Sequence, residues 1–179
     1  MNLTLRDNGI LEVAEVIGGR IGKIHWHALP DPRATDTPTR YQIPERTSFN
    51  GGEGIWYQEK LVYFTTKGDN RVWAYNTDNK ELNIIYNAAV FMHPVLTGVD
   101  NITANASGEL LVAEDGGDMQ IVVLNQTSVL PLLQVVNHDR SEITGPAFSP
   151  DGSRLYFSSQ RGTSGKSEGG ITFEITGPF

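Results

Sequence analysis

The chain has 179 residues, of which 39% are hydrophobic and 20% charged, and its formal net charge is −7, so its composition is that of a globular protein. The acidic balance argues against nucleic acid as a partner, because a nucleic-acid-binding protein needs a basic face. No apolar run reaches the ~18 residues of a membrane-spanning helix, so no membrane partner is expected, and the lack of cysteine excludes disulfides and thiolate metal sites.

Residues 1–50 are the less regular of two expected regions. Residues 1–9 are polar and lack the apolar core of a signal peptide, so the compartment is left open. The elements expected in this region are strands at 11–17 and 24–29 and a proline-rich loop at 31–44.

Residues 51–179 form the second region, which consists of three similar blocks of short strands rich in Val, Ile, Tyr, Trp and Phe. Turn-forming Gly, Pro, Asn and Asp residues separate the strands. The first block has expected strands at 54–58, 61–66, 71–76 and 82–86. The second has them at 101–105, 109–114, 119–124 and 129–136. The third has them at 143–149, 154–159 and 171–176, with a Gly/Ser-rich segment at 161–170 expected to be a mobile loop.

Each block begins with an acidic residue, namely Glu53, Asp100 and Glu142, at separations of 47 and 42 residues. A repeat of about 40–50 residues built from short strands is typical of a β-propeller. The sequence therefore predicts an all-β fold, a partial β-propeller of about three four-stranded blades. Because the first strand of each blade lines the central channel, we expect the three carboxylates to converge and to bind a hard cation that relieves their repulsion. The alternative is that these acids are ordinary turn residues.

Four further residues near these positions are candidates for the same site. Glu114 is a candidate ligand or an acceptor behind the ligands, with a solvated strand end as the alternative. The amide oxygen of Asn101 can serve Ca²⁺ or cap a turn. Lys67 and Arg161 are the cations nearest the expected channel, and each is either a phosphate contact or an ordinary surface cation.

Seven strings of this chain resemble, in order, motifs of the PhoX-type alkaline phosphatase family. They are FNGGEGIWY (49–57), VYFTTKGDNRVWAY (62–75), GVDNIT (98–103), LVAEDGGDM (111–119), SEITGPAFSPDG (141–152), LYFSSQRG (155–162) and EITGPF (174–179). The resemblance implies a six-bladed propeller with an iron–calcium cluster that hydrolyses phosphate monoesters. It also implies a bacterial protein, and members are commonly exported by the twin-arginine route, which would place a full-length relative in the periplasm or outside the cell.

The resemblance covers only the C-terminal half of such a protein, and two family features are missing from this chain, the twin-arginine signal and the cysteine that ligates iron. We therefore expect a phosphatase segment that needs a missing propeller half or self-association, with Ca²⁺ and Fe³⁺ as the cofactors implied by the family. The alternative is a non-catalytic, metal-stabilised propeller segment that acts as a binding or structural module.

Two other residue patterns bear on the chemistry of the chain. His25 and His27 share one face of an expected strand, and such a pair can bind a transition metal, although no acid cluster lies near them in the sequence. No nucleophile arrangement is expected, because Ser141 and the pair Ser158-Ser159 have no base nearby in the sequence. Hydrolysis by this chain would therefore depend on metal ions.

Overall fold

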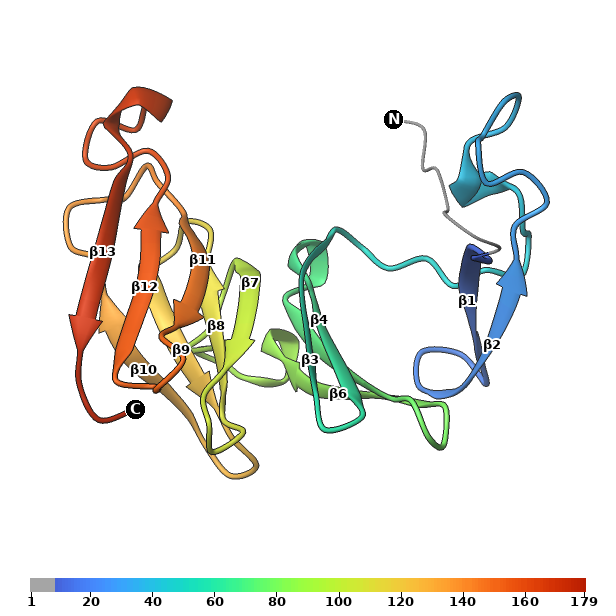
Figure 1. Cartoon of the computed structure of the whole chain (residues 1–179), viewed down its shortest axis with the longest axis horizontal. Helices are drawn as coiled ribbons and strands as arrows, with labels where there is room; N and C mark the ends of the chain where they lie inside the picture. Colours follow the sequence, from blue (N-terminus) through green and yellow to red (C-terminus); the bar gives the residue numbers. More distant parts are fainter. Residues whose placement is uncertain (1–8) are drawn as a thin grey trace. The chain divides into compact units, whose positions relative to one another are not determined.

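A computed structural model describes residues 9–179, which form antiparallel sheets without an α-helix in that range (Figure 1). The polar segment 1–8 considered above lies outside the described residues. Within the described range, no helix is long and apolar enough to cross a membrane. The chain divides into two compact units. One comprises the described residues up to Phe49 together with Tyr75–Asn83, and the other comprises Asn50–Ala74 and Ile84–Phe179.

The first unit contains the hairpin of β1 (Glu12–Ile17) and β2 (Gly22–Ala28), paired in continuous register from Glu12 opposite Ala28 to Ile17 opposite Lys23. Glycines with positive φ form the turn between the strands. β2 also pairs with the beginning of β6 (Glu81–Asn87) through Leu82 and Glu81. The expected proline-rich loop carries only one short 3₁₀ turn, η1 (Thr39–Tyr41).

The second unit contains three blades in chain order, and the all-β partial propeller expected from the sequence is confirmed. The first blade consists of β3 (Gly52–Gln58), β4 (Leu61–Thr66), β5 (Arg71–Asn76) and β6, the last two of which also contribute residues to the first unit. The second consists of β7 (Val99–Ala104), β8 (Leu110–Glu114), β9 (Gln120–Leu124) and β10 (Val129–Gln134). The third consists of β11 (Ile143–Phe148), β12 (Arg154–Ser159) and β13 (Ile171–Thr176). Short 3₁₀ turns lie at η2 (Lys67–Asp69), η3 (Ala88–Val90) and η4 (Ser167–Gly169).

The second blade is buried on both faces, and its central strand β8 shows why. All five residues of β8 are buried, and successive side chains of a strand point to opposite faces. Val112 packs into a cluster with Val72 and Tyr86 of the first blade, whereas Leu111 packs into a cluster with Leu155 and Phe157 of the third. The two hydrophobic cores therefore lie on either side of the second blade and join the three blades of the second unit into one stack.

The first strand of every blade carries an irregularity in its pairing with the second strand. The register shifts between Gly52 and Ile55 in β3, between Val99 and Ile102 in β7 and between Thr144 and Ala147 in β11. A bulge of this kind bends a strand and re-aims its side chains, and bulges are frequent beside functional sites. The acids Glu53 and Asp100 lie in two of these bulges.

Candidate functional site

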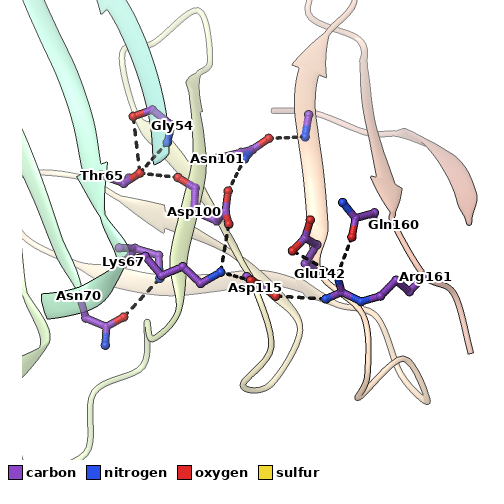
Figure 2. A network of polar contacts seen from close by, with 12 residues as sticks. Gly54, Thr65, Lys67, Asn70, Asp100, Asn101, Asp115, Glu142, Gln160 and Arg161 are labelled. Carbon is purple, nitrogen blue, oxygen red and sulfur yellow. Dashed lines mark hydrogen bonds and ion pairs between the residues drawn. The ribbon is translucent and has the colours of Figure 1, made fainter. Parts of the chain in front are cut away.

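Three carboxylates from the second and third blades lie close together (Figure 2). They come from the start of β7, the end of β8 and the start of β11. Asp100 comes from the bulge of β7, Asp115 follows the last residue of β8, and Glu142 precedes the first residue of β11. Each offers a carboxylate oxygen, and these three atoms lie within 4.8 Å of one another. Asp115 and Glu142 also form an isolated antiparallel bridge, so backbone pairing holds two of the three together. We call these three residues the acidic cluster.

Two cations lie between these carboxylates. The Lys67 ammonium forms a short ion pair with Asp115 and lies 3.6 Å from Asp100. The Arg161 guanidinium lies 3.3 Å from Asp115 and 3.5 Å from Glu142. Three negative and two positive charges leave the group with a formal charge of −1, so most of the repulsion within the acidic cluster is offset by these two side chains.

Hydrogen bonds from Thr65 and Asn101 hold Asp100 in place within the acidic cluster. The Thr65 hydroxyl donates to the carbonyl oxygen of Asp100 at 2.5 Å and accepts from the amide of Gly54 at 2.9 Å, which ties the first blade to the second. The side-chain amide of Asn101 donates to the Asp100 carboxylate, and its oxygen accepts from the amide of Gly145 at 2.7 Å. Asn101 therefore bridges β7 and β11, and its amide oxygen already has a backbone partner.

Strand register separates Glu142 from the other two acids of the predicted repeat. Gly52, Val99 and Ile143 pair with the last residues of the second strands, so Glu53 and Asp100 are equivalent positions and Thr144 is their counterpart in the third blade. Our assumption that Glu142 occupies the same position was wrong by two residues. Glu142 instead reaches the acidic cluster through its bridge to Asp115. The cluster does not include Glu53, which is exposed on β3.

Glu114 has a different environment from the acidic cluster. Its side chain is fully buried, and its carboxylate accepts hydrogen bonds from the amides of Thr97 at 2.9 Å and Gln120 at 3.0 Å. Burial raises the pKa of the Glu114 carboxyl, and these hydrogen bonds act in the opposite direction. Glu114 therefore fixes the backbone just before β7 and at the start of β9 by accepting these two hydrogen bonds. Its neighbour Asp115, rather than Glu114, is the member of the acidic cluster.

A buried Ser–His contact lies behind Arg161 and contradicts our expectation that the serines lack a base. His138 Nδ1 lies 2.7 Å from the Ser159 hydroxyl, which donates to the Ser141 hydroxyl at 2.8 Å. Ser141 in turn accepts from the Arg161 amide at 2.8 Å. All three side chains are buried, so the chain positions Arg161 rather than presenting a nucleophile to a substrate. The spacing in the sequence did not reveal this contact, because His138 lies in the connection between β10 and β11 whereas Ser159 is the last residue of β12.

A hollow of about 680 Å³ lies away from the acidic cluster, between β6 and the turn that joins β9 to β10. Exposed apolar residues such as Val90 and Phe91 line it together with His93, and none of the cluster residues does. The candidate chemistry of the chain therefore lies in the carboxylates and cations of Figure 2 rather than in this hollow.

Comparisons with known proteins bear on the fold of the chain. No model of a known protein family matches it, and no curated protein does. A solved structure of a luciferin-regenerating enzyme resembles it with a TM-score of 0.56 and 19% sequence identity, over 87% of this chain and 48% of that one. A structural genomics protein of unknown function from Bacteroides thetaiotaomicron VPI-5482 matches with a TM-score of 0.49 and 16% identity, over 64% of this chain and 28% of that one. The chain thus spans about half, or less, of the length of these structures, and the first likeness supports the propeller-like fold.

Proposed function

We propose that this chain carries part of the active site of a metal-dependent phosphatase of the PhoX type, which hydrolyses phosphate monoesters. The observation that supports the proposal is the acidic cluster with Lys67 and Arg161 between its carboxylates. A phosphatase needs positive charge at the phosphoryl group, either from metal ions or from Lys and Arg side chains. The carboxylates of the cluster could hold a metal ion, and Lys67 and Arg161 could contact the phosphate directly.

The carboxylate oxygens of the cluster suit a hard cation such as Ca²⁺. Ca²⁺ takes 6–8 oxygen ligands, of which Asp100, Asp115 and Glu142 would supply at least three. The cysteine ligand of the family's iron cannot be provided, because the chain has no cysteine. When bound, Ca²⁺ would supply positive charge at the phosphate. The carboxylates would then no longer need Lys67 and Arg161 as their partners, and both cations would be available to hold phosphate oxygens.

A second candidate function is a non-catalytic propeller module. The observation in its favour is that Lys67 and Arg161 already link all three blades by ion pairs with Asp100, Asp115 and Glu142. Such a network can join blades without any catalytic role.

The test compares Asp115→Asn with Asp118→Asn, an exposed aspartate three residues away that lies outside the acidic cluster. Ca²⁺ binding is followed by calorimetry, and hydrolysis of p-nitrophenyl phosphate is followed with Ca²⁺ supplied. We expect Asp115→Asn to lose both Ca²⁺ binding and hydrolysis, and Asp118→Asn to keep both. Ca²⁺ binding that depends on Asp115 without any hydrolysis would favour the non-catalytic module, and equal binding by all three proteins would reject the metal site itself.

A further inference from the structure

Side chains of types that can bind a metal also lie together on the β1–β2 hairpin, within the first unit. His25 and His27 alternate along β2 and therefore share a face, and their ring centroids lie 4.5 Å apart in an edge-to-face arrangement. Glu15 of β1 is directly opposite His25 in the register, so it lies on the same face. The structure thus adds a carboxylate that the spacing of the histidines in the sequence did not reveal.

Glu15 holds one histidine in a defined orientation. Its carboxylate lies 2.8 Å from Nε2 of His27, and the side chains of His27 and Glu15 are 24% and 26% exposed, so the contact is open to solvent on one side. If Nε2 carries the proton donated to Glu15, the lone pair of the neutral imidazole is on Nδ1. Histidines that bind metals typically donate their second ring nitrogen to a carboxylate in this way.

The positively charged residue beside the histidines on this face already has partners of its own. Lys23, the next residue of β2 on the same face, directs its ammonium to Glu81 at 3.1 Å and to the carbonyl oxygen of Asn79 at 2.8 Å. Its positive charge is therefore already partnered. His25 is exposed, so its ring can turn toward His27 without disturbing buried contacts.

We propose that His25 and His27 bind a divalent d-block cation of the Zn²⁺ class, and that Glu15 is the residue that positions His27 for it. Two imidazoles on one strand face suit Zn²⁺, which prefers nitrogen donors, whereas the acidic cluster offers oxygen donors suited to harder cations. This site is separate from the proposed phosphatase site and does not depend on it. Its cation would join the two histidines and stabilise the β1–β2 hairpin by binding the folded chain.

The experiment is a calorimetric titration of the full chain with ZnCl₂ in the presence of excess Ca²⁺, which occupies oxygen-donor sites. We expect one equivalent of Zn²⁺ to bind the parent protein. His25→Ala and His27→Ala should each weaken binding by more than the ~10–100-fold typical of the loss of an outer-shell partner. His93→Ala, a substitution of an exposed histidine outside this hairpin, should bind Zn²⁺ like the parent.

The role of Glu15 is tested by two substitutions at that position. The amide oxygen of Glu15→Gln can still accept the proton of His27 Nε2, whereas Glu15→Leu cannot. We expect Zn²⁺ affinity to fall in the order parent, Gln, Leu, with roughly a tenfold loss or more for Leu. Equal affinity of Glu15→Leu and the parent would reject the positioning role. Failure of the parent to bind Zn²⁺, or full binding by both histidine variants, would reject the site.

Discussion

At the scale of single residues, two glutamates five positions apart show how environment decides what a carboxyl group does. Glu114 is fully buried, and burial raises its pKa. Glu109 accepts hydrogen bonds from Asn105 at 2.9 Å and Asn125 at 3.2 Å, and these contacts lower its pKa. The same side chain therefore contributes to stability with opposite dependence on pH at the two positions.

We predict opposite pH effects for Glu114→Gln and Glu109→Gln. Between its unfolded pKa and its raised folded pKa, Glu114 keeps its proton only in the folded state, so its stabilising contribution is full at low pH and is lost as pH rises. The contribution of Glu109 is present above its unfolded pKa and is lost as pH falls through its lowered folded pKa. Urea unfolding across a pH series should show that Glu114→Gln removes a decline of stability with rising pH, while Glu109→Gln removes a decline with falling pH. Parallel curves for both variants and the parent would contradict this assignment.

At the scale of elements, the contact between the first strands of neighbouring blades positions the acidic cluster. A side chain at Gly54 of β3 would place its Cβ 2.6 Å from the carbonyl oxygen of Asp100 and 2.7 Å from the amide of Ile102, both in the backbone of β7. These distances are too short for any real contact, so β3 and β7 approach as closely as they do because residue 54 is glycine.

We predict that Gly54→Ala destabilises the protein by about 1–3 kcal/mol, the usual cost of overpacking a close contact. Gly52→Ala is the matched control, because it lies on the same strand and its Cβ would meet nothing within 4 Å. Urea denaturation gives both values. Equal stability of the two variants would show that β3 and β7 can move apart freely. Because Thr65 of β4 is hydrogen-bonded to both Gly54 and Asp100, Gly54→Ala should also weaken the proposed binding of Ca²⁺ by the acidic cluster.

The elements themselves could be predicted from the sequence, whereas the site could be predicted only in part. Short apolar runs separated by turn residues located β4 and β12 at their observed bounds, because this pattern is local. The place of Asp115 in the acidic cluster, and its bridge to Glu142, depend on how the second blade packs against the third. A local sequence pattern carries no information about that packing. The pairing of Glu15 with His27 likewise needed the register of β1 on β2.

At the scale of the whole molecule, the edge strands β10 and β13 of the described blades differ in how well they are protected against pairing with another strand. β10 contains Pro131 and a register shift, both of which discourage pairing with another strand. β13 pairs with β12 in unbroken register from Thr176 to Ile171, and among the described residues it has no neighbour on its other side. It also lacks Lys and Pro, the usual protective residues, so β13 is more open than β10 to pairing with a second chain.

We therefore predict that the isolated chain self-associates through β13 and that a lysine on this strand reduces the association. Ile171→Lys puts a charge on the edge strand at a position that is already 42% exposed, so the fold should tolerate it. Ile10→Lys introduces the same charge at a residue that is 72% exposed and lies outside every strand, and it controls for the change in net charge. Sedimentation equilibrium should show an association constant at least about fivefold lower for Ile171→Lys, equivalent to about 1 kcal/mol, and an unchanged one for Ile10→Lys. A parent chain that sediments as a monomer at every concentration would show that β13 needs no partner strand, and equal weakening by both lysines would assign the association to net charge rather than to this edge.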